Sequence, residues 1–212
     1  MSNSLEERGA ASGRRWWVVG LLFAAVAINL MDRGNLSIAA VPLMSSMNLS
    51  PKAMGLLLSV FFWTYAALQI PAGYIVDRFG FRSIYAIAFL LWSLASASVG
   101  LANSFGQIIA FRLLLGVAES VAHPLSLSYI KRSFHEKEQG LPTGIYVSGM
   151  MVGAGAGSLL GGLFLRYWGW RNLFLATGLG ACVWLIPWLL LAPATPARST
   201  PKRTRTDFRI PL

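Results

Sequence analysis

The sequence contains few of the residues that disulfides, metal sites and hydrolytic active sites need. Its 212 residues include one cysteine, Cys182, and two histidines. A single cysteine excludes an intrachain disulfide and a cysteine-based metal site. No Ser/His/Asp arrangement, Cys/His cluster or HExxH motif is present. We therefore expect no enzyme, no bound metal and no organic cofactor.

Charged residues are also scarce. They make up 12% of the chain, whereas hydrophobic residues make up 55%, and there are eight tryptophans. The formal net charge of +10 would suit a nucleic-acid partner, but the chain is too apolar for a protein of that class. Nucleic acid is therefore excluded as a partner, and the basic excess needs another explanation.

What the sequence does have is six long apolar runs, each of roughly the twenty residues that cross the hydrocarbon of a bilayer. We place these spans at 16–40, 54–76, 83–101, 105–130, 142–165 and 171–192. A helix satisfies its own backbone hydrogen bonds in lipid, so we predict an all-α membrane protein with six transmembrane helices. Residues 1–15 form a polar N-terminal tail, and residues 193–212 form a basic, proline-rich linker or tail next to the lipid headgroups.

Basic residues are distributed unequally between the two sides of this arrangement. Thirteen fall on the side of both termini, and only Lys52, Arg166 and Arg171 fall on the other. The thirteen are Arg8, Arg14, Arg15, Arg78, Arg82, Lys131, Arg132, Lys137, Arg198, Lys202, Arg203, Arg205 and Arg209. Because Lys and Arg collect on the cytoplasmic side of a bilayer, we predict that both termini are cytoplasmic.

Four charged residues lie inside spans, where charge is costly and usually functional. Asp32 and Arg33 are adjacent in the first span, and Arg112 and Glu119 lie seven positions apart on one face of the fourth. Asp32 and Arg112 fall at similar depths, so we predict an ion pair between them. Arg33 would then be free for an anion, since a guanidinium matches a carboxylate bidentately. Glu119 has no assured partner, and desolvation lets such a carboxyl take up a proton.

Structural readings of these residues remain open. A buried ion pair can simply fix the register of two helices, which suits Arg112 as well as a functional role does. His123, beside Pro124, is either a proton relay or a hydrogen-bonded histidine at a kink. Tyr65 and Gln69 either line a cavity or hydrogen-bond between helices.

A glycine stripe runs along the fifth span, at Gly149, Gly153, Gly157 and Gly161. A helix face without side chains suits close packing against another helix. Within one group of six helices we see no evident use for it. We therefore expect this face to contact lipid, or a partner chain that carries further helices.

The segment after the second span resembles the signature loop of the major facilitator superfamily. It reads Gly73-x-x-x-Asp77-Arg78-x-Gly80-x-Arg82 and matches that signature in full. By this resemblance the segment is a loop that gates conformational change.

Other segments resemble the anion:cation symporter branch of that superfamily, and the similarity runs through all six spans. They are Ile28 to Ser37, Gln69 to Gly73, Phe111 to Glu119, Glu136 to Glu138 and Gly169 to Phe174. The branch includes proton-coupled carriers of galactonate, hexuronate and glucarate, and the sialin-type vesicular carriers. The chain departs from several relatives at Met150, where they have glutamine.

The resemblance assigns roles to the charged residues. It implies that Arg33 is a ligand of the substrate anion and that Tyr65 lines the substrate cavity. It also implies that Asp32 and Glu119 couple protons, and that Arg112 tunes them. We therefore expect a small organic anion as substrate, protons as the coupling ion, and residence in the plasma membrane, the inner membrane of the cell.

The superfamily is built from two six-helix halves, each a 3+3 inverted repeat, with the substrate between them. The chain supplies one such half. Two hypotheses follow. In the first, the chain is the N-terminal half of a secondary transporter that works by alternating access with a second six-helix half, and does not transport alone. In the second, it is a truncated, non-transporting remnant or a membrane interaction module.

Overall fold

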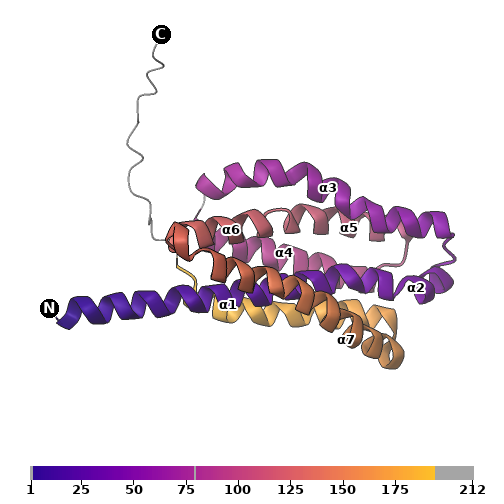
Figure 1. The fold of residues 1–212 in the computed structure, drawn as a ribbon. Helices are drawn as coiled ribbons and strands as arrows, with labels where there is room; N and C mark the ends of the chain where they lie inside the picture. Colours follow the sequence, from indigo (N-terminus) through magenta and orange to yellow (C-terminus); the bar gives the residue numbers. More distant parts are fainter. Residues whose placement is uncertain (1, 79, 194–212) are drawn as a thin grey trace, which may run out of the picture.

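The computed structural model describes residues 2–78 and 80–193, with side chains for residues 13–69 and 80–193. All the secondary structure in this part of the chain is helical, and the helices run side by side along one direction (Figure 1). They are α1 (Ser2–Ile38), α2 (Ala40–Met47), α3 (Pro51–Arg78), α4 (Phe81–Leu101), α5 (Phe105–Glu119), α6 (Ala122–Ser133), α7 (Gly140–Ala181) and α8 (Leu185–Leu191), with 3-10 turns η1 (Glu136–Glu138) and η2 (Cys182–Trp184). The predicted all-α class is confirmed.

Five helical stretches of the described chain are long and apolar enough to cross a membrane. They are Gly13–Ile38, Pro51–Gln69, Phe81–Leu101, Phe105–Ser133 and Gly140–Leu191. The last contains 52 residues and corresponds to two predicted spans. Gly169 divides it, with φ 73° and ψ 172°, in the left-handed region that glycine adopts without strain.

Prolines account for other breaks in the helices. A proline has no N–H, so the carbonyl four residues before it loses its helical partner. Pro42, Pro124 and Pro187 free the carbonyls of Ile38, Ser120 and Val183 in this way. Helix α1 ends at Ile38, α5 gives way to α6 around Ser120, and η2 includes Val183. The first predicted span therefore continues past residue 40 as the separate helix α2, up to Met47.

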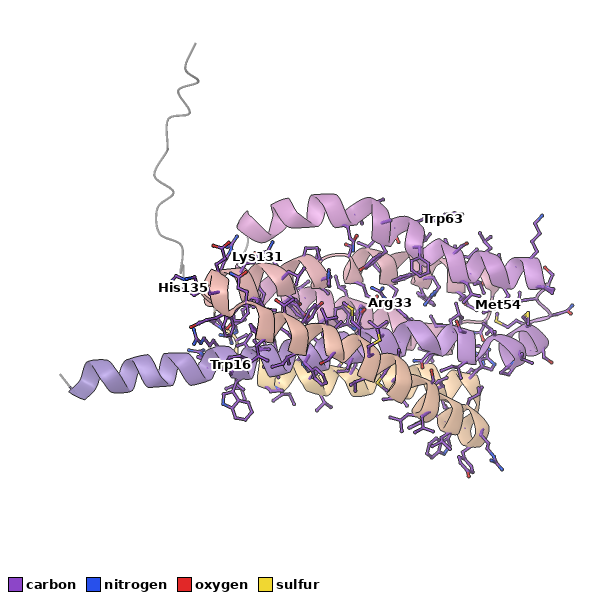
Figure 2. All side chains as sticks on the ribbon, viewed as in Figure 1. Trp16, Arg33, Met54, Trp63, Lys131 and His135 are labelled. Carbon is purple, nitrogen blue, oxygen red and sulfur yellow. The ribbon has the colours of Figure 1, made fainter. Side chains whose placement is uncertain are left out.

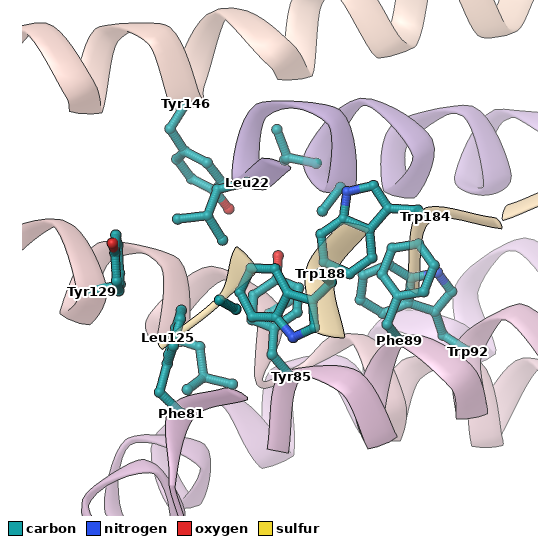
Figure 3. Packing of buried hydrophobic residues seen from close by; sticks show 14 of the residues in the cluster. Leu22, Phe81, Tyr85, Phe89, Trp92, Leu125, Tyr129, Tyr146, Trp184 and Trp188 are labelled. Carbon is teal, nitrogen blue, oxygen red and sulfur yellow. The ribbon is translucent and has the colours of Figure 1, made fainter. Parts of the chain in front are cut away.

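A core of aromatic side chains joins α4 to η2 and α8 (Figure 3). Phe81, Tyr85, Phe89 and Trp92 follow helical spacing on one face of α4, and all four are buried. Phe89 stacks on Trp184 with ring centroids 4.2 Å apart. Trp184 and Trp188 also donate their indole N–H groups to backbone carbonyls, as buried tryptophans usually do.

The two ends of the bundle are chemically distinct. Figure 2 shows Lys131 and His135 at one end and Met54 toward the other. Basic side chains at the first end bind helix termini there, since Arg14 donates to the carbonyl of Leu191 at 2.9 Å. A second buried cluster, which includes Leu36, Leu57 and Phe174, holds the other end together.

The glycine stripe packs inside the bundle, and the expectation that it contacts lipid or a partner chain is wrong. Along α7, Gly149, Gly153 and Gly157 meet Phe23, Ala27 and Met31 of α1, so both helices contribute every fourth residue. A Cβ atom at Gly149 would lie 2.7 Å from the carbonyl oxygen of Phe23. Gly161 likewise meets Ile38. The four glycines are helix-packing residues, and the contact they make is that of α1 with α7, the most extensive in the bundle.

Candidate functional site

An ion pair between α1 and α5 lies at the centre of the candidate site. Arg33 Nε donates to Glu119 Oε2 at 2.7 Å. The Glu119 side chain is fully buried, whereas that of Arg33 is 21% exposed. Arg33 lies about midway along the bundle (Figure 2). The pair therefore has its acid on the inside and its cation toward accessible space.

Two aromatic residues of α3 hold the guanidinium of Arg33 from another side. Its Cζ lies 4.4 Å from the ring centroid of Tyr65 and 4.9 Å from that of Phe61. Phe61 and Tyr65 are stacked on each other with centroids 5.4 Å apart. Cation–π contacts of this kind fix a guanidinium without using its N–H donors. Arg33 uses Nε for its hydrogen bond to Glu119, so the ion pair itself does not occupy the two terminal amino groups, which lie on the side of Tyr65.

The predicted ion pair between Asp32 and Arg112 does not form, and Glu119, which had no assured partner in the sequence analysis, pairs with Arg33. Glu138 pairs with Arg15. Both carboxylate oxygens of Asp32 are buried without a hydrogen-bond partner among the described residues. Nε and Nη1 of Arg112 are also buried without a hydrogen-bond partner among the described residues.

Helix geometry explains this difference. Adjacent helical residues point about 100° apart, because 3.6 residues complete a turn. Asp32 and Arg33 thus project from α1 toward different neighbours, and Arg33 is the one that reaches α5. Arg112 instead approaches the ring of Phe61, with its Cζ 5.1 Å from the centroid. The similar membrane depths of Asp32 and Arg112 do not determine which way each side chain points from its helix.

Asp32 lies among polar side chains from other helices. Its electrostatic neighbours include Glu119, Arg112 and the hydroxyls of Ser96 on α4 and Thr177 on α7. Arg112 is 3% exposed and Asp32 1% exposed. Two acids and two arginines thus share one buried region, and their formal charges cancel.

A cavity of about 110 Å³ opens beside Arg33. Tyr65 also lines it, so the two residues that sequence analysis assigned to substrate lie on one wall. Asp32, Arg112 and Glu119 do not line it. Arg33 and Asn29 line the cavity and also contact Glu119, so they connect the cavity to this buried acid.

Further residues line the cavity that sequence analysis did not assign to the site. They include Asn29, Trp92, Tyr146 and Met150. His123 lines it too, and its Nδ1 lies 3.0 Å from the hydroxyl of Tyr146. Asn29 is a polar residue in an apolar span, three residues before Asp32, and that position could have identified it as part of the site. Nothing in the sequence distinguishes Tyr146 from the aromatic residues of the core.

The signature segment lies at the end of the bundle where α3 gives way to α4. Gly80 is exposed and directly precedes α4, and Arg82 donates from the first turn of α4 to the carbonyl of Leu189. The side chains of Asp77 and Arg78, together with residue Gly73, lie outside the described side chains. In the described part of the chain, no group of three or more His, Cys, Asp or Glu residues could hold a metal ion.

Solved structures share this fold. A bacterial homolog of the human lysosomal transporter Spinster, crystallised in an inward-facing and occupied conformation, superposes with a TM-score of 0.81 at 26% identity. The match covers 87% of this chain and 45% of that one.

Curated relatives are transporters, as the resemblance implied, and not enzymes. The probable L-galactonate transporter of Escherichia coli is 32% identical over 81% of this chain and 38% of its own length. The probable galactarate/D-glucarate transporter of the same organism is 28% identical over 89% of this chain and 44% of its own length. A sodium-dependent phosphate transport protein of Arabidopsis thaliana is 30% identical over 86% of this chain and 36% of its own length.

The chain thus spans well under half the length of these relatives. The sequence model of the Major Facilitator Superfamily matches residues 22–212, which is most of the chain. This match, on a chain whose described secondary structure is a helical bundle, shows that the chain belongs to the Major Facilitator Superfamily.

Proposed function

We propose that the chain is the N-terminal half of a secondary active transporter that carries a small organic anion, of the sugar-acid type, together with protons. It works by alternating access against a second six-helix half, which completes the cavity from the opposite side. Arg33 binds the anion, Tyr65 shapes the cavity, and Asp32 and Glu119 take up protons. Arg112 balances their charge.

One observation supports this proposal above the others. The guanidinium at the cavity wall is bound from behind by a fully buried carboxylate on another helix. Arginine offers two parallel N–H donors that fit a carboxylate, and the terminal amino groups of Arg33 are the ones that Glu119 leaves free. The names of the sugar-acid transporters among the relatives agree with an anion of this class.

The same geometry suggests how protons and anions would be coupled. With Asp32 and Glu119 ionised, the two acids balance Arg33 and Arg112. A proton on Glu119 removes the charge that holds Arg33, so the cavity becomes positive and binds an anion more tightly. By linkage, a bound anion then favours the proton to the same extent.

We also propose an orientation in the membrane and a role for the signature segment. We place the chain in the plasma membrane with both termini cytoplasmic, so that the segment from Gly73 to Arg82 faces the cytoplasm as a gate. The basic residues at that end of the bundle support this orientation.

Binding of D-galactonate to the purified chain in lipid nanodiscs tests the proposal. Arg33→Lys should weaken binding by about tenfold or more, because an ammonium point charge does not replace a planar fork. Arg166→Lys is the matched control, since Arg166 is not among the cavity-lining residues. The proposal is wrong if wild type binds no sugar acid, or if Arg33→Lys binds it as well as wild type does.

A further inference from the structure

The cavity contains more polar chemistry than an anion requires. Arg33 alone supplies a charge and donors for a carboxylate. Beyond it, Asn29, Trp92, His123 and Tyr146 also line the cavity, on four different helices. The proposed function gives none of these four a role, and a bundle in lipid gains little by placing polar groups in a cavity without use.

His123 and Tyr146 form a hydrogen-bonded pair, and the donors and acceptors that this bond leaves free can be counted. The His123 Nδ1 and the Tyr146 hydroxyl are 3.0 Å apart, joining α6 to α7. If the hydroxyl donates to Nδ1, the pair retains the Nε2 N–H as a donor and the phenolic oxygen as an acceptor. If Nδ1–H donates to the hydroxyl, the pair retains the phenolic O–H as a donor and Nε2 as an acceptor. Counting only the bond between the two residues, a neutral pair offers one donor and one acceptor in either tautomer.

The presence of both a donor and an acceptor favours some classes of ligand over others. An ionised carboxylate or phosphate oxygen only accepts, so it leaves the acceptor of the pair unused. An alcohol both donates and accepts, so it satisfies the pair completely.

Buried N–H donors in the same cavity also favour a ligand that carries hydroxyl groups. Within the described part of the chain, the indole Nε1 of Trp92 and the amide Nδ2 of Asn29 are buried without a hydrogen-bond partner. Trp92 is fully buried. Asn29 is 5% exposed, and its amide also lies close enough to Glu119 to donate to that carboxyl, so Trp92 is the donor that most needs a ligand oxygen. A buried donor without a partner is costly, and a ligand oxygen would remove that cost.

We propose that His123 and Tyr146, supported by the N–H donors of Asn29 and Trp92, form a subsite that recognises the hydroxyl groups of a polyhydroxy carboxylate. This inference rests on the proposed function, because it takes Arg33 as the ligand of the carboxylate. The subsite selects hydroxylated acids over anions of equal charge that carry no alcohol.

The test compares D-galactonate with hexanoate, a six-carbon monocarboxylate without hydroxyl groups, by equilibrium binding to the purified chain in nanodiscs. Tyr146→Phe should weaken galactonate binding by about tenfold and leave hexanoate binding unchanged, because only the hydroxyl contact is lost. Tyr129→Phe is the control and should leave the binding of both acids unchanged, because Tyr129 is a buried tyrosine that does not line the cavity.

Variants at His123 separate recognition from packing. His123→Gln retains a donor and an acceptor and should keep part of the preference for galactonate, whereas His123→Phe should lose it. If Tyr146→Phe weakens both acids equally, or neither, the pair only links α6 to α7 and the inference is wrong. If wild type binds neither acid, the proposed function fails and this inference fails with it. If Arg33→Lys weakens binding but Tyr146→Phe does not change the preference for galactonate over hexanoate, the hydroxyl subsite is rejected and the proposed function stands.

Discussion

Arg82 and Arg171 each bind the carboxyl end of the span that the other begins. Arg82, in the first turn of α4, donates to the carbonyl of Leu189 in α8. Arg171, just after the break in α7, donates Nη1 to the carbonyls of Gly100 at 3.1 Å and Ala102 at 2.8 Å, at the end of α4. Each arginine follows a glycine and an aromatic residue, as Gly80-Phe81-Arg82 and Gly169-Trp170-Arg171. The third and sixth spans are equivalent in a 3+3 inverted repeat, so the repeat places one such link at each end of the bundle.

The link at Arg171 should contribute measurably to stability. The last carbonyls of a helix have no helical partner, and a cation that binds them also interacts favourably with the helix dipole. Arg171→Gln should lower the free energy of unfolding by about 1.5–3 kcal/mol, the usual range for hydrogen bonds to charged groups. Thermal unfolding in detergent measures this as a lower midpoint. Arg166→Gln is the control, because Arg166 makes only a 5.7 Å contact with the ring of Tyr167. Equal shifts in the two variants would contradict the assignment.

The packing of α7 on α1 gives a second prediction. A Cβ atom at Gly153 would collide with the carbonyl oxygen of Ala27, whereas one at Gly155 would meet nothing within 4 Å. Gly153→Ala should therefore destabilise the chain by about 1–3 kcal/mol through overpacking. Gly155→Ala adds the same methyl group to the same helix and should be neutral or slightly stabilising. Unfolding midpoints of the two variants, compared with wild type, decide the matter, and equal stability of all three proteins would show that α1 and α7 do not meet at Gly153.

Sequence analysis predicted the fold because the apolar runs and the signature segment are local signals. The helical class followed from the runs of apolar residues, and the family followed from Gly80, Arg82 and the rest of the signature. The break at Gly169 also coincides with the gap between the last two predicted spans. Local chemistry of this kind does not depend on how the helices are rotated relative to one another.

The direction of each side chain in the bundle could not be predicted in this way. Asp32 and Arg33 are neighbours in the sequence, yet only Arg33 reaches Glu119. The partner of the glycine stripe was likewise missed, because the stripe is compatible with any close neighbour until α1 is placed against it. Tyr146 enters the site only through the approach of α7 to α6, a contact between distant parts of the chain.

Reporter fusions test the orientation in the membrane. Lys52 lies in the first turn of α3, and Lys137 lies in η1, between α6 and α7. The distribution of basic residues predicts that Lys137 is cytoplasmic and Lys52 is on the opposite side. Fusions or thiol labels at these positions should therefore report opposite sides. A fusion at Glu138 provides a control that must agree with Lys137, and the same side for Lys52 and Lys137 would contradict the six-span topology.

Glu119→Gln tests the coupling between protons and anions. The glutamine resembles the protonated acid, so it leaves Arg33 without its ion-pair partner at every pH. For wild type, we expect the affinity for D-galactonate to rise as pH falls, because a proton on Glu119 releases Arg33 and leaves the cavity positive. In Glu119→Gln, the affinity should stay high and lose most of this pH dependence. The titratable and charged groups that face this region, Asp32, Arg112 and His123, are unchanged in both proteins, so the difference between them reports on Glu119. Glu138→Gln removes an exposed acid that pairs with Arg15 at 3.7 Å and should keep the wild-type profile. Binding at several pH values in nanodiscs measures all three proteins. An unchanged pH profile in Glu119→Gln would exclude Glu119 as the coupling group and leave Asp32, the other buried acid, as the candidate.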